Sequence, residues 1–318
     1  MQVNTPGFTM FHRKSRLYRS RVYLSETLMA EDTTTALIEK QEWLDTAADT
    51  LQKAVTSAYE AGGEAGQRIK DAMHGTWLGH PLHAAVTDVP IGAWTASVVM
   101  DAIDEMSPSS GMKTGADTAL AIGLAGAGLA AVAGLTDWSA TDGRARKIGL
   151  THGLLNVAAV GLFTTSFFMR RADKRTEGRA LSAIGFATSM LSAWLGGKLT
   201  YSEQIGADHT VGQHFPNEFT RVLADSELGE GQMRRVEVNG SRALLAKRDG
   251  HIYSIAEVCS HLGGPLAEGE FTGTEVRCPW HGSCFSLEDG SVIHGPATHP
   301  QPCLETRIQD GQIEIRSR

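Results

Sequence analysis

Residues 259–285 read CSHLGGPLAEGEFTGTEVRCPWHGSCF and contain four side chains of the kinds that bind metals. They are Cys259, His261, Cys278 and His281, arranged as C-x-H, sixteen residues, and C-x-x-H. Two thiolates and two imidazoles suit either zinc or an iron–sulfur cluster. Zinc knuckles and ribbons more often use C-x-x-C or H-x3-5-H pairs, and this stretch has neither.

The first box separates its Cys and His by one residue, so both side chains point the same way along an extended loop. Each box can then give its Cys to one iron and its His to another, as a [2Fe–2S] centre with two Cys and two His ligands requires. Gly263, Gly264 and Gly282 lie beside the predicted ligands, where backbone must approach the sulfides and donate N–H groups. The spacing therefore predicts an iron–sulfur centre.

The same residues resemble the Rieske family. CSHLGGPL matches its first box, CPWHGSCF its second, and GPATHPQP at 295–302, which includes Pro296, is similar to its proline-rich third loop. The resemblance covers about the last hundred residues and implies an antiparallel, all-β Rieske fold with a [2Fe–2S] cluster. Four unrelated metal-type residues, or a zinc site, are the competing interpretation.

Family members that oxidise quinols have an extra Cys in each box, joined as a disulfide, and a Tyr hydroxyl near the cluster. This sequence has Gly264 and Trp280 at the cysteine positions and Phe285 at the Tyr position, but keeps Ser283 as a candidate donor to a sulfide. Fewer donors stabilise the reduced cluster less. The resemblance therefore implies a low potential, on the order of −150 mV, as in Rieske ferredoxins.

Length and charge narrow the class of protein further. The chain has 318 residues, room for two domains, and its net charge of −7 disfavours a nucleic-acid surface. Cys284 and Cys303 are left over; two isolated thiols are favoured over a disulfide between them. Residues 1–35 are polar and lack an apolar signal segment, so we expect a disordered start, with Met29 as a candidate translation start.

Residues 36–74 have apolar side chains at three- and four-residue spacing, which predicts an amphipathic helix broken or kinked at Gly62 and Gly63. Its polar face mixes acidic residues with Lys, so docking on the rest of the protein is favoured over a membrane surface.

Residues 75–205 contain four nearly uncharged runs of about bilayer length, at 84–100, 119–136, 148–169 and 180–197. They predict a four-helix transmembrane domain in a bacterial cytoplasmic membrane, with a soluble bundle as the alternative. Lys and Arg are balanced between the two sides, so they do not predict topology. We expect the Rieske domain in the cytoplasm, because low-potential members of that family meet soluble reductases.

This region resembles an uncharacterised family of small bacterial four-helix membrane proteins, through GHPLHAAVTDVPIGAW (79–94), GLTDWSA (134–140) and LTHGLLN (150–156). Ionisable residues inside a bilayer are costly and usually functional. The ionisable residues at or inside the apolar runs here are His80, His83, Asp88, Asp137 and His152. His83 and His152 are candidate axial ligands of a b-type haem, the set is a candidate quinone or proton site, and boundary hydrogen bonding is the structural alternative.

Residues 206–216 read as a linker, and 217–318 as an all-β domain with hairpin turns at Asn239, Asp249, Asp289 and Asp310, each followed by Gly. This last segment has 15 acidic and 10 basic residues, a net charge of −5, which would steer it towards a basic redox partner.

The sequence therefore predicts an α + β multidomain protein, a four-helix transmembrane bundle followed by an all-β Rieske domain. The expected function is a membrane-anchored, low-potential electron carrier served by a soluble reductase or other redox partner. The alternatives are a membrane oxidoreductase with a second redox site in the helices, and a redox-sensing module. A Rieske oxygenase catalytic subunit is not expected, because a two-His-one-carboxylate iron domain would have to follow the cluster domain.

Overall fold

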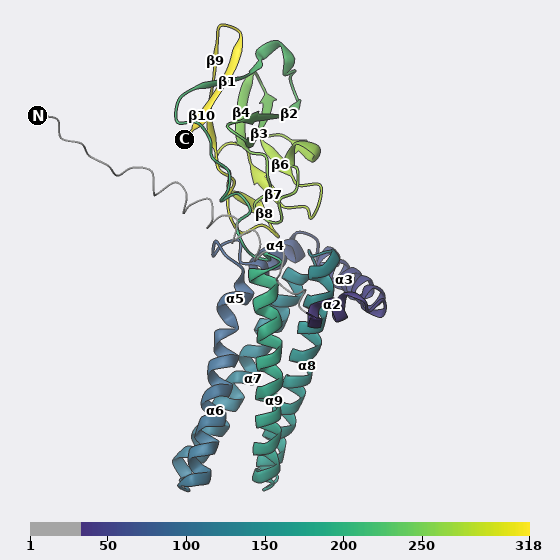
Figure 1. Cartoon of the computed structure of the whole chain (residues 1–318), viewed down its shortest axis with the longest axis vertical. Coiled ribbons are helices and arrows are strands. Elements are labelled where there is room, and N and C mark those ends of the chain that lie inside the picture. The colour runs from purple at the N-terminus through teal and green to yellow at the C-terminus, as the bar shows by residue number, and fades with distance from the viewer. Residues whose placement is uncertain (1–32) are drawn as a thin grey trace, which may run out of the picture. The chain divides into compact units, whose positions relative to one another are not determined.

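The computed structural model describes residues 33–318. The segment predicted to be disordered, with Met29, lies outside the described residues except for 33–35, which begin helix α2 (Thr33–Glu39). From Leu44 onwards the chain forms one compact unit (Figure 1).

The helix expected over 36–74 is three helices in the structure: α2, α3 (Trp43–Ala61) and α4 (Gly63–His74). The interruption between α3 and α4 falls at Gly62, next to Gly63 with a φ of +52°. α4 ends at Gly75, whose φ of +82° is a left-handed conformation that Gly adopts without a steric cost.

Helix α3 docks on the helices that follow, as its mixed polar face predicted. Its Asp45 pairs with Lys147 at 2.8 Å, and its Tyr59 hydroxyl lies 2.6 Å from the hydroxyl oxygen of Thr136. Gln52 donates to the carbonyl oxygen of Trp138 at 3.0 Å. These polar contacts hold α3 against residues 136–147, where one long helix ends and the next begins.

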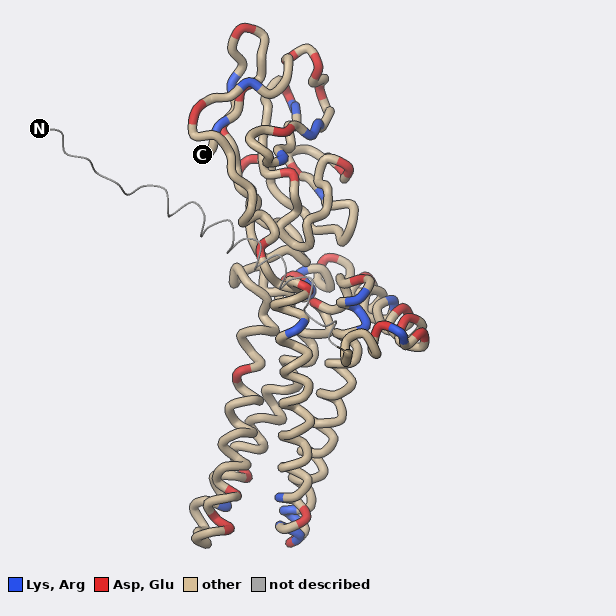
Figure 2. Tube along the Cα trace, in the orientation of Figure 1, with Lys and Arg blue, Asp and Glu red and all other residues tan. Residues whose placement is uncertain are grey.

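The long helices are α6 (Asp88–Met106), α7 (Ser110–Trp138), α8 (Gly143–Arg171) and α9 (Arg175–Tyr201), preceded by the short α5 (Leu82–Val86). α7, α8 and α9 are long and apolar enough to cross a membrane. Within the described part of the chain, α6 does not join these three, since its 19 residues include four acidic side chains. The expected four spans are thus three candidate spans and a more polar fourth helix. Figure 2 shows charged residues gathered at the helix ends.

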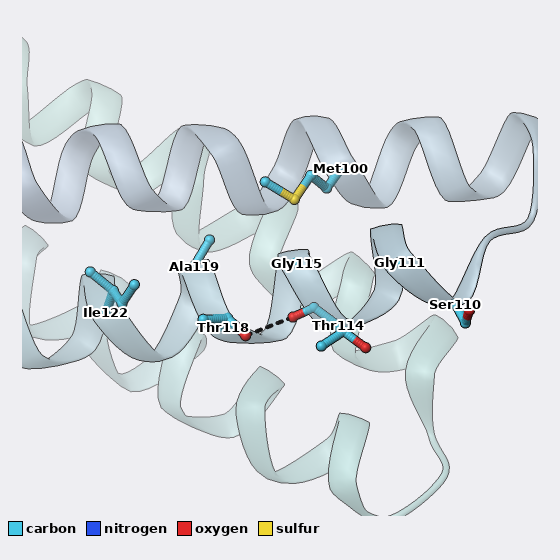
Figure 3. A pocket seen from close by; sticks show the side chains of 8 residues that line it. All are labelled: Met100, Ser110, Gly111, Thr114, Gly115, Thr118, Ala119 and Ile122. Atoms are coloured by element: carbon cyan, nitrogen blue, oxygen red, sulfur yellow. Dashed lines mark hydrogen bonds between the residues drawn. The ribbon is translucent and has the colours of Figure 1, made fainter.

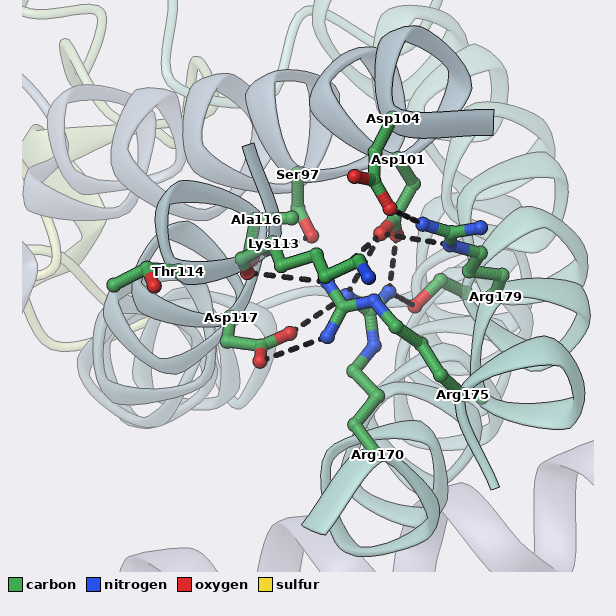
Figure 4. A network of polar contacts seen from close by, with 12 residues as sticks. Ser97, Asp101, Asp104, Lys113, Thr114, Ala116, Asp117, Arg170, Arg175 and Arg179 are labelled. Atoms are coloured by element: carbon green, nitrogen blue, oxygen red, sulfur yellow. Dashed lines mark hydrogen bonds and ion pairs between the residues drawn. The ribbon is translucent and has the colours of Figure 1, made fainter. Parts of the chain in front are cut away.

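Ion pairs join the four long helices where α6 and α8 end and α9 begins (Figure 4). Arg170, whose side chain is 1% exposed, contacts Asp101, and it lies 3.0 Å from Asp117. Arg175 bonds to Asp117 at 3.0 Å, and Arg179 contacts Asp104. Three of the four acidic residues of α6, Asp101, Asp104 and Glu105, are therefore paired with arginines from α8 and α9.

An open groove between α6 and α7 has mostly apolar walls (Figure 3). Its lining includes Met100, Gly115 and Ile122. The Thr118 hydroxyl donates to the carbonyl oxygen of Thr114 in its own helix, so it is not directed at a ligand. The groove therefore has the character of a packing surface for lipid or another apolar helix.

Three antiparallel sheets form the C-terminal domain. Their strand orders are β1-β10-β9, β2-β3-β4 and β5-β6-β7-β8. The strands are β1 (Thr220–Ala224), β2 (Met233–Val238), β3 (Ser241–Arg248), β4 (His251–Ala256), β5 (Glu270–Thr272), β6 (Glu275–Arg277), β7 (Cys284–Ser286), β8 (Val292–His294), β9 (Leu304–Gln309) and β10 (Gln312–Ser317).

Hairpin turns set the register of these sheets. Asn239-Gly240, Asp249-Gly250 and Asp310-Gly311 have positive φ at both residues, the conformation of a type I′ turn. At Asp289-Gly290, only the glycine has positive φ. The inward-facing strand residues then form two buried clusters, one around Leu244, Ile255, Leu266 and Phe285 and the other around Leu245 and Ile313.

Candidate functional site

Two loops bring the four predicted ligands together, and each loop follows a strand. Cys259 and His261 lie in the loop after β4, whereas Cys278 and His281 lie in the loop between β6 and β7. The imidazole ring centres of His261 and His281 are 5.0 Å apart. The Cys259 and Cys278 thiols are within hydrogen-bonding reach of each other. The side chains are thus sorted into a Cys pair and a His pair.

The two loops have the same backbone hydrogen bonds. The N–H of Cys259 donates to the carbonyl oxygen of Gly264 at 2.9 Å, and Cys278 makes the equivalent bond to Ser283 at 2.8 Å. The Cys259 carbonyl accepts from Gly263, and the Cys278 carbonyl accepts from Gly282. Both of these glycines have a positive φ, +77° and +79°, so the tight turn explains why the sequence has Gly at both places.

Electrostatics favour the ligating forms of Cys278 and of both histidines, whereas the hydrogen bond with Cys278 and burial raise the pKa of the Cys259 thiol. The hydrogen bond with Cys259 lowers the pKa of the Cys278 thiol to about 7, helped by backbone N–H groups and opposed by burial. Burial is the main reason that the pKa values of His261 and His281 lie below the ordinary histidine value. A thiolate and neutral imidazoles are the forms that bind metals.

The surroundings of the loops also fit an iron–sulfur group. His261 Nδ1 is buried and has no hydrogen-bond partner, so a ligating nitrogen is left available. A Cβ at Gly264 would lie 2.8 Å from Cys278 Sγ and 3.1 Å from the Trp280 ring, so only Gly fits between the loops without displacement. Ser283 is fully buried, and its Oγ accepts from the N–H of Ala297 at 3.0 Å, which leaves its hydroxyl hydrogen to donate elsewhere. The residues present therefore fit a [2Fe–2S] cluster.

Other predicted neighbours of the site are placed as follows. Phe285 is fully buried in the core below the second loop, whereas Trp280 is 56% exposed. Pro296 is buried in the third loop, which follows β8. The Ser260 hydroxyl donates to the carbonyl oxygen of His299 at 2.7 Å and joins the first loop to the third. Cys284 and Cys303 are both free thiols.

Helix α4 contacts the third loop through residues that the sequence analysis did not single out. Asp71 Oδ2 lies 2.9 Å from His294 Nδ1, and Asp71 Oδ1 accepts from the N–H of Gly295 at 2.9 Å. His74 is fully buried, and a Cβ at Gly295 would fall 3.0 Å from its ring. The sequence gives no signal for this contact. What marks it is the burial of His74 at the end of α4, which is seen only in the structure.

The predicted ionisable residues of the helical region lie in two separate contacts and at two exposed positions. Asp137 Oδ1 lies 2.8 Å from His74 Nδ1, and the ring centres of His83 and His152 lie 6.3 Å apart. His80 and Asp88 are exposed, and neither contacts the other histidines. The set is therefore not one site: His83 and His152 face each other, Asp137 joins His74, and the remaining two stand apart.

Comparisons with known proteins agree with this geometry. Residues 218–305 match the family model described as Rieske [2Fe-2S] domain, and residues 79–209 match the one described as Predicted membrane protein (DUF2231). Ferredoxin CarAc of Metapseudomonas resinovorans is 30% identical over 96 residues, which are 30% of this chain and 90% of that protein.

A larger relative matches the same part of the chain. Apoptosis-inducing factor 3 of Mus musculus is 34% identical over 91 residues, 29% of this chain and only 15% of that protein. Among solved structures, the ferredoxin of carbazole 1,9a-dioxygenase from Nocardioides aromaticivorans IC177 is 22% identical, with a TM-score of 0.30, over 31% of this chain and 98% of that one.

A Rieske domain implies a [2Fe–2S] cluster, and its likeness to ferredoxin components supports a role in electron transfer. The two family matches cover different parts of the chain, namely the helical region and the β-sheet domain. The chain belongs to the Rieske [2Fe–2S] family through residues 218–305, fused to a domain of the DUF2231 family of predicted membrane proteins at residues 79–209.

Proposed function

We propose that this protein is a membrane-anchored carrier of single electrons. Its cluster would be held by Cys259, His261, Cys278 and His281. The observation that supports this best is the pair of equivalent loops, which place two Cys and two His side chains together with matching backbone bonds. A cluster with this ligand set accepts and releases one electron at a time.

The residues around the ligands hold the thiolates and give access to one side of the site. Backbone N–H groups of His261 and Leu262 point at Cys259, and those of Trp280 and His281 point at Cys278, where they stabilise negative charge. Trp280 is exposed next to His281, which makes this edge of the second loop the contact point for a redox partner. The absence of a hydroxyl at Phe285 favours the low end of the Rieske potential range, on the order of −150 mV.

The helical region serves as the anchor in the lipid bilayer. We place the membrane domain at 75–205 and the Rieske domain at 217–318, with 36–74 as an amphipathic segment and 206–216 as a linker. α6 is proposed as a fourth span, because the arginines of α8 and α9 pair with three of its four acidic residues, Asp101, Asp104 and Glu105. The linker is bonded to the Rieske domain, since the His209 N–H donates to the carbonyl oxygen of Ser260 at 3.1 Å.

The partner that we propose is a soluble reductase on the cytoplasmic side. Relatives named as ferredoxins include Ferredoxin CarAc and the ferredoxin component of a naphthalene 1,2-dioxygenase system from Pseudomonas putida, 27% identical over 94 residues. The net charge of −5 over 217–318 favours a basic face on the partner.

The test is low-temperature EPR of the detergent-purified, full-length protein, before and after reduction with dithionite. We expect a Rieske-type signal that is lost in Cys259→Ser and His281→Ala and kept in two matched controls, Cys303→Ser and His251→Ala. A redox titration should give a potential on the order of −150 mV. No Rieske signal in iron-replete protein prepared without oxygen would refute the proposal.

A further inference from the structure

Two histidines face each other inside the helical region, away from the cluster loops. His83 lies on α5 and His152 on α8, and their ring planes are 88° apart. Their ring centres are separated by 6.3 Å, within the range of an edge-to-face ring pair. Two imidazoles on opposite sides of one metal ion would have centres about 6.5 Å apart, given metal–nitrogen bonds of about 2.0–2.1 Å. The observed spacing is that of a pair of axial ligands.

Each ring is held by a carbonyl oxygen of another helix. His83 Nδ1 lies 2.8 Å from the carbonyl oxygen of Ala130 on α7, and His152 Nδ1 lies 2.7 Å from that of Ser192 on α9. A carbonyl oxygen only accepts, so both Nδ1 atoms bear the hydrogen. Both Nε2 atoms then have a lone pair. A backbone carbonyl on the other nitrogen is the usual way in which a protein orients a metal-binding His.

Asn156 supports the same assignment of hydrogens. Its Nδ2 lies 3.1 Å from His152 Nε2, and an amide nitrogen only donates, so His152 Nε2 accepts. This bond is the one that a metal at Nε2 would replace. The Asn156 side chain lies one helical turn along α8 from His152.

The small number of ligands decides which metal group fits. Outside the two cluster loops, the described residues contain no group of three or more His, Cys, Asp or Glu side chains that could hold a metal ion, so a four-ligand zinc or copper ion has no site among these helices. A porphyrin supplies four nitrogens itself and needs only two axial ligands from the protein. Helical bundles build such sites from side chains on facing helices.

We propose that His83 and His152 are the axial ligands of a b-type haem bound among α5, α7, α8 and α9. This site is a second one-electron centre, distinct from the cluster site in its residues and in its domain. It explains why two costly imidazoles are retained within apolar helices and why both are held in the same tautomer.

The test is optical spectroscopy of the full-length protein, purified in detergent from cells supplied with a haem precursor. We expect a Soret band, α and β bands after dithionite, and about one haem per chain by the pyridine haemochromogen assay. His83→Ala and His152→Ala should each lose at least nine-tenths of the haem. His80→Ala, an exposed His three residues from His83, is the matched control and should keep it.

The Rieske EPR signal is recorded on the same samples. Its loss in a variant would reveal a folding defect, and its absence in the wild type would refute the cluster proposal independently of the haem result. A haem-free wild type that keeps its cluster, and that gives no low-spin spectrum when titrated with hemin, would overturn the assignment. So would full haem content in both single variants, or a bound quinone extracted from haem-free protein.

Discussion

Phe285 and Gly264 set the immediate surroundings of the cluster ligands. Phe285 is fully buried beside the second loop and brings no hydrogen-bond donor. A Cβ at Gly264 would fall within 2.8 Å of Cys278 Sγ, so the missing side chain lets the first loop lie against the second. Phe285 thus affects the electrostatics of the site, and Gly264 affects its packing.

Replacing Phe285 with Tyr should raise the reduction potential. A hydroxyl that donates to the cluster or a ligating sulfur stabilises the reduced, more negative state. A bond worth about 1 kcal/mol raises the potential of a one-electron couple by about 40 mV. An EPR-monitored redox titration measures the shift, with Phe285→Leu as the control without a hydroxyl. An unchanged or lower potential in Phe285→Tyr would contradict this explanation of the low potential.

Replacing Gly264 with Ala should impair cluster retention. The added methyl group must push apart Cys278 and the Trp280 ring, and overpacking of this kind costs about 1–3 kcal/mol. We expect several-fold faster loss of iron and acid-labile sulfide during incubation at moderate temperature. Gly212→Ala is the matched control, since a Cβ there meets nothing within 4 Å. Equal retention in the two variants would show that the loops are not closely packed here.

At the scale of elements, the third loop is held from two directions. Ser260 bonds it to the first loop, and Asp71 on α4 bonds to both His294 and Gly295. Asp71 is mostly buried, with its side chain 15% exposed, so these bonds are only weakly exposed to competing water. Helix α4 therefore helps to order the third loop.

Replacing Asp71 with Ala should loosen the third loop. The N–H of Gly295 loses a charged acceptor, and such bonds are worth about 1.5–3 kcal/mol. We expect hydrogen–deuterium exchange at Gly295 to accelerate by about tenfold or more, a factor that corresponds to at least 1.4 kcal/mol. Glu64→Ala, at an exposed position of the same helix, should leave the rate unchanged. Equal protection in both variants would mean that the loop does not depend on α4.

At the scale of the whole molecule, one ion-pair network joins α6, α7, α8 and α9. Asp101 is its centre, since it contacts Arg170, Arg175 and Arg179. Three of the five basic residues in 170–179 are therefore engaged in internal ion pairs.

Replacing Asp101 with Asn should destabilise the helical region. Removing one partner of a buried pair leaves the nearly inaccessible Arg170 short of negative charge, at a cost of about 3–5 kcal/mol. A thermal unfolding scan in detergent should show a markedly lower midpoint, with the Rieske EPR signal intact before heating. Glu105→Gln, whose side chain is 71% exposed, should change the midpoint little. Similar midpoints in both variants would show that the network does not stabilise the protein.

Local patterns were enough to predict much of this protein. Asn-Gly and Asp-Gly turns predicted the hairpins that join β2 to β3, β3 to β4 and β9 to β10, because turn preferences depend on neighbouring residues. Long apolar runs likewise predicted α7, α8 and α9. α6 was predicted as an equal span, and its acidic residues set it apart because their partners lie about 70 residues further along the chain.

The sequence by itself determined the family, the cluster type and the candidate ligands, since two short boxes place specific side chains at a fixed spacing. It also determined that His83 and His152 lie in apolar segments. Only the tertiary structure decided which ionisable residues meet: His83 with His152, His74 with Asp137, and Asp71 with the third loop more than 200 residues away. The physical reason is that periodicity reports which face of an element is buried, whereas the partner buried against it is chosen by packing between elements distant in the chain.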